Sequence, residues 1–297
     1  MNPTDIIQSG VSLIIPTYRN PQYLDLCLHS ALENSILEKT KIIVAVDGYV
    51  EESKKIIESY RTFSDSYANK LIILEYEQNY GMAYAINSSV IVSPNDLIFV
   101  INDDNVLPLE WDMRLTTLYT IPHCREMLSD KDKLCLTINQ VENSNGMFGF
   151  EVNDKLGNTW EDFDYDQWLI YENEIENVSA KSELLFDSRG FIFPFAMKKN
   201  MFLACGGFDL TYTGPNFVDW DFFIKLQLLK FTGLRTNGMH LYHFGSIVTK
   251  HSKETPMFSQ RALECAQLYQ TKWGIKPFHN SETYSRIPPN CQSLSII

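Results

Sequence analysis

The sequence of 297 residues has little positive charge, because 25 lysines and arginines stand against 37 aspartates and glutamates and give a formal net charge of −12. This balance argues against nucleic acid as a partner, since its phosphates are bound chiefly by clustered lysine and arginine side chains. An anionic substrate would instead need a metal ion or helix N-termini to hold it.

The sequence also lacks an uninterrupted apolar run of the ~18 residues that a bilayer span requires. Its first residues, Met1 to Asp5, show neither the basic start nor the apolar core of a signal peptide. We therefore expect a cytoplasmic protein with no transmembrane segment. The six cysteines form no C-x-x-C pair, which argues against structural zinc and against a disulfide framework.

Four short apolar runs in the first third of the chain are typical of strands buried in a parallel sheet. They cover residues 11–15, 41–46, 71–76 and 97–101. The segments between the first runs have apolar residues at helical spacing, which gives the order β-α-β-α-β. This order favours parallel strands joined by right-handed crossovers. Chain length and composition fit one large α/β domain or two small ones.

Each run ends in a polar segment, and the carboxyl ends of parallel strands lie along one edge of a sheet. The segments are Pro16-Thr17-Tyr18, Asp47-Gly48, Asn79-Tyr80-Gly81 and Asn102-Asp103-Asp104-Asn105. In the last, two adjacent carboxylates repel each other unless a cation offsets their charge, and their oxygens suit Mg²⁺ or Mn²⁺. Taken alone, that segment could equally be a polar turn that caps the next helix.

Three later segments also carry polar or glycine residues of interest. Gly206-Gly207, before a phenylalanine, predicts a tight backbone turn near a ligand. Asp219 and Asp221 stand two apart at the start of an apolar helix, where capping of free N–H groups is the alternative to a catalytic role. His240 and His243 are three residues apart, and an ordinary hydrogen-bonded histidine is the alternative to a metal ligand.

In this order and spacing the motifs resemble the family 2 inverting glycosyltransferases of the GT-A fold. The likeness includes the run from Asn79 to Asn87 and continues past residue 200. It implies an α/β fold of the GT-A type, with a Rossmann-like, mostly parallel sheet flanked by helices, an acceptor-side insertion and a C-terminal helix. We expect a glycosyltransferase domain at 1–255, made of a nucleotide-binding half (1–108) and an acceptor and catalytic half (109–255), and a C-terminal helical extension at 256–297.

The resemblance implies a metal-dependent enzyme of glycan biosynthesis. It would transfer a sugar from a nucleotide-diphosphate donor, with a UDP-sugar favoured, to a hydroxyl of a glycan or other acceptor. Asp219 matches the general base, although Val218 replaces the glutamate that usually precedes it. Asp104 and His243 match the ligands of Mn²⁺ or Mg²⁺, with His240 a lesser candidate. The expected nucleotide-binding residues are Pro16, Thr17, Tyr18, Asp47, Asn79, Gly81, Asn102 and Asp103, and the expected acceptor or donor-sugar contacts are Gly207, Trp220 and Asp221.

Two registers of the acidic motif remain open. In an Asn-x-Asp register, Asn102 faces the ribose and Asp104 binds the metal, whereas in an Asp-x-Asp register Asp103 takes the ribose and Asn105 becomes a neutral ligand. We prefer Asp104, because an amide holds Mn²⁺ less well than a carboxylate does.

Two further segments, and the function itself, each allow a second interpretation. The aromatic residues within 142–182 would either pin a solvated insertion to the core or form an acceptor platform. An amphipathic helix after residue 256 would pack on the core, or else make a peripheral membrane contact. The rival functions are a nucleotidyltransferase of similar topology and a non-catalytic sugar-binding or scaffold protein of the same fold.

Overall fold

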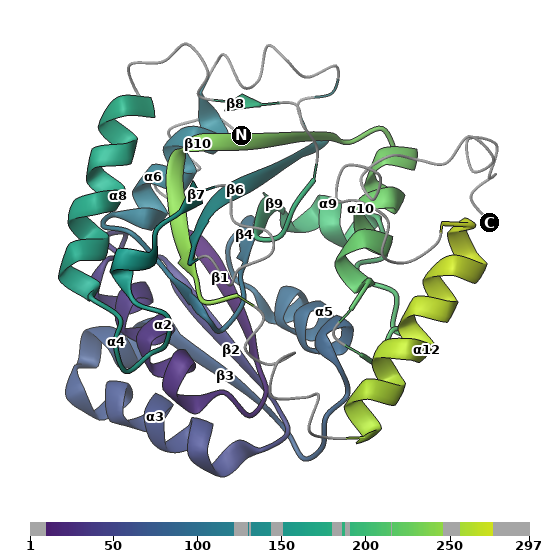
Figure 1. Cartoon of the computed structure of the whole chain (residues 1–297), viewed down its shortest axis with the longest axis horizontal. Coiled ribbons are helices and arrows are strands. Elements are labelled where there is room, and N and C mark those ends of the chain that lie inside the picture. The colour runs from purple at the N-terminus through teal and green to yellow at the C-terminus, as the bar shows by residue number, and fades with distance from the viewer. Residues whose placement is uncertain are drawn as a thin grey trace.

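The computed structural model describes residues 10–121, 130, 132–143, 151–179, 186–187, 191–214, 216–245 and 256–275. These residues form an α/β structure in which helices flank a curled sheet (Figure 1). Across the sheet, the main path of neighbouring strands is β3-β2-β1-β4-β9-β6-β10-β5, with β7 beside β6 and β8 beside β10. Among the described helices, none is both long enough and apolar enough to cross a membrane.

The first half of the chain builds the parallel part of the sheet. β1 pairs in parallel with β2 and with β4, and β2 pairs in parallel with β3. The predicted β-α-β-α-β order is therefore confirmed. The elements are β1 (Val11–Thr17), α2 (Pro21–Glu33), β2 (Lys41–Asp47), α3 (Val50–Phe63), α4 (Asp65–Lys70), β3 (Leu71–Tyr76), α5 (Met82–Val92) and β4 (Leu97–Val100).

The second half extends the sheet through an antiparallel strand. β9 runs antiparallel to both β4 and β6, and β6 then pairs in parallel with β10, so β9 joins the two parallel groups. The elements are β5 (Asn105–Val106), α6 (Trp111–Thr120), β6 (Leu134–Glu142), β7 (Glu151–Val152), η1 (Asp154–Leu156), α8 (Tyr165–Ser179), β8 (Phe186–Asp187), β9 (Phe195–Lys198), α9 (Lys199–Ala204), α10 (Val218–Leu228), β10 (Thr232–His243) and α12 (Pro256–Trp273).

The alternation of side chains along β1 divides the core between the two faces of the sheet. Leu13 and Ile15 pack with α2, α3 and α6 on one face, whereas Ile14 packs with α5, α9, α10 and α12 on the other. Burial on both faces explains why β1, β2 and β4 are continuous apolar runs. The prediction that 71–76 is a buried strand is wrong in its burial, because β3 lies at the edge of the sheet and most of its residues are only half-buried. Because α12 shares the second core with α10, its described part is packed on the sheet domain.

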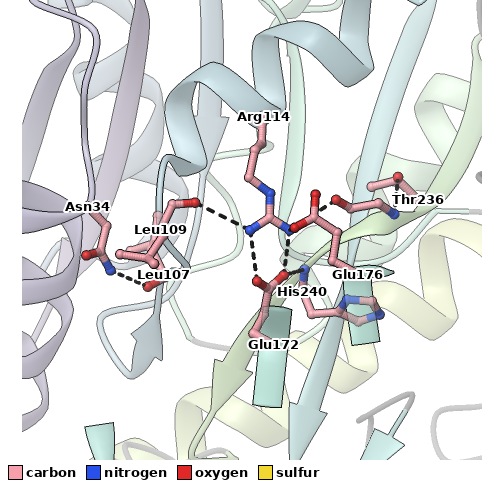
Figure 2. A network of polar contacts seen from close by, with 9 residues as sticks. Asn34, Leu107, Leu109, Arg114, Glu172, Glu176, Thr236 and His240 are labelled. Carbon is pink, nitrogen blue, oxygen red and sulfur yellow. Dashed lines mark hydrogen bonds and ion pairs between the residues drawn. The ribbon is translucent and has the colours of Figure 1, made fainter. Parts of the chain in front are cut away.

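The described part of the 142–182 segment is fixed to the core by α8. Trp168 is fully buried beside Tyr242 of β10. Arg114 of α6 binds Glu172 of α8 through two bonds of 2.8 and 2.7 Å, and the same carboxylate accepts the His240 backbone N–H at 3.1 Å (Figure 2). These contacts favour the first interpretation of the segment, in which its side chains pin it to the core.

Candidate active site

Asp103 and Asp104 follow β4 and take different partners. Asp103 is 5% exposed and accepts bonds from Thr17 Oγ1 at 2.6 Å and from Asn20 Nδ2 at 3.1 Å. Burial and the neighbouring Asp104 raise the pKa of Asp103 to about 7, although the Thr17 and Asn20 bonds oppose this rise. Asp103 is thus tied to the last residue of β1 and to the loop between β1 and α2.

Asp104 lies against His243, at the end of β10. His243 Nε2 is 3.3 Å from Asp104 Oδ1, and each residue is 5% exposed. Strand pairing makes this contact, because β10 places His243 opposite Asn105 of β5, and Phe244 N–H bonds to the Asp104 carbonyl at 3.2 Å. Asn102 approaches the same imidazole, with Nδ2 3.5 Å from His243 Nε2. The two predicted metal ligands therefore meet, although 139 residues of sequence separate them.

Glu142 completes this cluster and was not predicted. It ends β6, is 1% exposed and lies 2.5 Å from His243 Nδ1 through Oε1. Burial lowers the pKa of His243, but Asp104 and Glu142 outweigh that effect and raise it to about 10. A carboxylate that binds one ring nitrogen of a histidine fixes the orientation of the other ring nitrogen. Here Glu142 binds Nδ1 of His243, and Nε2 points to Asp104.

His240, the lesser candidate, lies away from this cluster. An odd separation of three along a regular strand places His240 and His243 on opposite faces of β10. Burial lowers the pKa of His240, whose charged neighbours are Glu172, Glu151 and Arg114. The structure therefore gives no support to His240 as a metal ligand.

Asp47, at the end of β2, is hydrogen-bonded to the turn that follows β3. Its carboxylate accepts the backbone N–H groups of Tyr80 at 2.7 Å and Gly81 at 2.8 Å, and its carbonyl accepts Asn79 Nδ2 at 3.3 Å. Gly81 has a φ of +94°, and a Cβ there would stand 2.8 Å from the Thr213 carbonyl oxygen. Glycine is thus required both by the backbone conformation and by the close approach of a second loop.

A pocket of about 310 Å³ opens at the ends of β1, β2 and β3. It contains the predicted residues Tyr18 and Asn79, while Pro16 and Thr17 lie in the strand that leads to it. The other lining residues were not predicted as site residues, and they include Arg261 from α12. The full lining is Tyr18, Arg19, Gly48, Tyr49, Glu77, Gln78, Asn79 and Arg261.

The turn at Gly206 and Gly207 is bonded to α5. Both glycines have positive φ, at +76° and +62°. Asn87 donates to the Phe208 carbonyl and accepts the Phe208 N–H, both at 2.8 Å. A Cβ at Gly207 would lie 2.5 Å from Asn87 Oδ1. The predicted turn is therefore present, and Asn87 of the recognised motif has a structural part in it.

Asp219 and Asp221 lie in the first turn of α10 and have different surroundings. Asp219 is partly exposed, and burial raises its pKa to about 6. Asp221 is 0% exposed and accepts bonds from Trp273 Nε1 at 2.8 Å and Tyr212 Oη at 3.2 Å, and it pairs with Lys272 at 2.7 Å. The structure thus ties Asp221 to α12, whereas the sequence predicted a sugar contact for it.

Trp220, between these two aspartates, packs with its ring centroid 4.9 Å from Phe217 and 6.1 Å from Tyr269 of α12. It remains partly exposed. The contact of Trp220 with the donor sugar or the acceptor, which the sequence predicts, stays a prediction.

Residues 12–120 match the family model described as Glycosyl transferase family 2. The glycosyltransferase GlyG of Streptococcus pneumoniae is 26% identical over 196 residues, which cover 65% of this chain and 58% of that protein. The chain therefore spans less than two thirds of the length of this relative. The match to the family model contains all the predicted nucleotide-binding residues.

Two solved structures share the fold. A mannosyltransferase from Pyrobaculum calidifontis, in complex with GDP-Man and Mn²⁺, has a TM-score of 0.57 at 13% identity, over 93% of this chain and 67% of that one. S. aureus TarS, in complex with UDP-GlcNAc, has a TM-score of 0.57 at 12% identity, over 93% of this chain and 69% of that one. With the match at residues 12–120, the resemblance of this chain to the family 2 glycosyltransferases of the GT-A fold is confirmed.

Proposed function

We propose that this protein is an inverting, metal-dependent glycosyltransferase that moves a sugar from a nucleotide-diphosphate donor, preferably a UDP-sugar, to a hydroxyl of a glycan or other acceptor. The observation that carries this proposal is the buried pair of Asp104 and His243 on the sheet whose other strand ends form a pocket. The complexes of the two neighbours with GDP-Man and UDP-GlcNAc support a nucleotide sugar as the donor.

The Asp104 and His243 pair fits a divalent cation. A carboxylate oxygen and an imidazole nitrogen are suitable ligands for Mn²⁺. Here the two atoms, Asp104 Oδ1 and His243 Nε2, are 3.3 Å apart. Among the described residues, no group of three or more histidine, cysteine, aspartate or glutamate side chains is arranged to hold a metal. The remaining ligands would come from donor phosphates and water, as is usual for Mg²⁺. A cation held there would offset the negative charge that develops on the diphosphate leaving group.

The other residues divide between donor and acceptor. The strand-end pocket with Tyr18 and Asn79 would receive the nucleoside, and Asn102 would face the ribose. Asp103, which accepts bonds from Thr17 and Asn20, would act on nucleotide binding by holding the start of the loop that leads to this pocket. Asp219 would take the proton from the acceptor hydroxyl as it attacks the anomeric carbon, and one carboxylate suffices for that role. Gly207 and Trp220 remain proposed sugar contacts, whereas for Asp221 we propose an anchoring role in place of a sugar contact, because its carboxylate is buried against α12.

The proposed catalytic domain covers residues 1–255, with the helical extension after it. The part of that extension at 276–297 lies outside the described residues. The cytoplasmic location and the possible peripheral membrane contact remain predictions from the sequence.

Product analysis tests the proposal directly. The protein would be incubated with Mn²⁺ and a panel of sugar nucleotides, with acceptor sugars present, and the products would be separated. Release of a nucleoside diphosphate with transfer of the sugar supports the proposal. Release of pyrophosphate from a nucleoside triphosphate would favour the nucleotidyltransferase, and tight glycan binding without turnover of any donor would favour the non-catalytic protein.

A further inference from the structure

We propose that Arg261, on the C-terminal helix α12, contacts the nucleobase of the donor and sets its preference among bases, so that α12 forms part of the donor site. This inference rests on the proposed function, because it names a wall of the same site. It also assigns α12 a role beyond packing on the core.

Sheet order separates the pocket from the candidate metal ligands. The pocket lies at the ends of β1, β2 and β3, whereas Asp104 and His243 lie at the ends of β4 and β10. β2 and β4 are two strands apart, which is about 10 Å. A diphosphate beside Asp104 would therefore leave the pocket to the nucleoside, and we assign the base to it.

Arg261 is the contribution of α12 to this pocket. Its Nη1 donates to Asn79 Oδ1 at 2.6 Å, and the amide of Asn79 donates to the Asp47 carbonyl at 3.3 Å. An arginine carries five N–H donors, so the bond to Asn79 uses only one of them. Base carbonyl and ring-nitrogen acceptors differ in position between bases, which lets a fixed guanidinium discriminate among them.

The pocket lining also contains a second arginine, Arg19, which lies over two aromatic rings. The Arg19 guanidinium carbon lies 5.1 Å from the centre of the Tyr49 ring and 5.4 Å from that of Tyr18. Arg19 and Tyr49 both have left-handed backbones, with φ of +54° and +61°. Strained non-glycine residues cluster at ligand sites, because the surrounding fold must hold them there. In a chain with net charge −12, the lining of this pocket has two arginines and one acidic residue, Glu77.

Contacts in the middle of α12 fix Arg261 beside the pocket. The Gly214 N–H bonds to Cys265 Sγ at 3.3 Å, and a Cβ at Gly214 would lie 3.0 Å from the Arg261 carbonyl oxygen. The adjacent Thr213 in turn touches Gly81, in the turn that Asp47 holds. The helix therefore contacts the donor turn directly, through the Arg261 bond to Asn79, and also through the intervening loop.

The far end of α12 is anchored as well. Trp273 Nε1 bonds to Asp221 at 2.8 Å, and Lys272 pairs with Asp209 at 2.7 Å. Figure 1 shows α12 along the side of the molecule near α5 and α10, with which it shares the core. Contacts in the middle and at the C-terminal end of α12 hold Arg261 in place before a ligand arrives, which lowers the entropic cost of binding.

Calorimetric titration of UDP, CDP, GDP and ADP in the presence of Mn²⁺ tests this assignment. For Arg261→Ala we expect the preferred nucleotide to bind about 10- to 100-fold more weakly, since hydrogen bonds to a charged group are worth that much. The other nucleotides should weaken less, so the preference shrinks. Arg261→Lys should restore only part of it, because a lysine lacks the planar fork of donors.

Gln260→Ala is the matched control, because Gln260 precedes Arg261 on the helix, is exposed and bonds to Glu264. It should leave all affinities unchanged, and melting temperatures would show that each variant is folded. Unchanged affinities in Arg261→Ala, or an equal loss for every base, would overturn this inference alone. A wild-type chain that binds no nucleoside diphosphate would overturn the proposed function and this inference with it.

Discussion

Asp219 and Asp221 are two residues apart on α10, and we expect their substitution to impair different properties of the protein, namely turnover for Asp219 and stability for Asp221. Asp221 is 0% exposed and is held by Trp273, Lys272 and Tyr212, whereas Asp219 is partly exposed. The structure therefore assigns stability to Asp221, and we propose catalysis for Asp219. A comparison of Asp219→Asn with Asp221→Ala separates these roles within one turn of helix.

Asp221→Ala should lower the melting temperature. It leaves the Trp273 N–H and the Tyr212 hydroxyl without their buried acceptor, and removes one of the two carboxylates that Lys272 pairs with. Each of the two buried donors left without this acceptor costs about 1–3 kcal/mol, or about 2–6 kcal/mol together, while Lys272, whose side chain is 34% exposed, keeps its pair with Asp209. At about 2–4 °C per kcal/mol for a chain of comparable size, the melting temperature should fall by roughly 10 °C in differential scanning calorimetry.

Asp219→Asn should instead remove turnover and leave the fold intact. Loss of a general base costs about 10²- to 10⁴-fold in kcat, while the affinity for UDP and the melting temperature should not change. In the wild type, burial raises the Asp219 pKa to about 6, and the base must be ionised to accept a proton. Turnover should therefore fall as the pH drops through about 6, with about one tenth remaining at pH 5.

Asp219→Glu provides the control for this assignment, since a displaced carboxylate should recover part of kcat and keep the acidic limb of the profile. Full turnover in Asp219→Asn would refute the general base. A normal melting temperature in Asp221→Ala, combined with a loss of turnover, would instead mean that Asp221 acts at the sugar, as the sequence predicted.

The remaining predictions concern the candidate metal ligands and the donor turn. Asp104→Ala should abolish the Mn²⁺-dependent part of UDP binding in calorimetric titration, and unchanged binding would move the metal site elsewhere. Glu142→Gln should weaken Mn²⁺ binding about 10- to 100-fold in an electron paramagnetic resonance titration with UDP present, because Glu142 orients His243; wild-type affinity would exclude that role. Gly81→Ala should destabilise the fold by about 1–3 kcal/mol in urea unfolding, since its φ is +94° and its Cβ would meet the Thr213 carbonyl; a variant as stable as the wild type would contradict the required glycine.

The sequence predicts the first half of the fold well, because each strand there is a contiguous apolar run followed by a helix. β1 to β4 lie where those runs lie. The second half depends on pairing between distant strands. β9 is inserted antiparallel between β4 and β6, although nearly 100 residues separate it from β4. Local periodicity contains no signal for that choice of partners.

The same distinction holds for the site. Residues that end a recognisable strand, such as Asp47 and Asp104, were predicted, and His243 was predicted through the family resemblance. Glu142 and Arg261 were missed. The only local signal for Glu142 is a carboxylate at the end of a buried strand, and Arg261 reaches the pocket only because α12 packs beside the 212–214 loop. Both depend on tertiary contacts that a single sequence does not encode in its local pattern.

The adjacent carboxylates after β4 show how tertiary contacts bear on an ambiguity that spacing leaves open. Two neighbouring carboxylates repel each other, and the cost falls when each acquires its own partners. Asp103 has the hydroxyl of Thr17 and the amide of Asn20, both neutral donors, whereas Asp104 has His243. A carboxylate whose two oxygens both accept hydrogen bonds is a poorer metal ligand than a carboxylate that lies beside an oriented imidazole. The Asn-x-Asp register, with Asp104 as the metal ligand, is therefore the one that these partners favour.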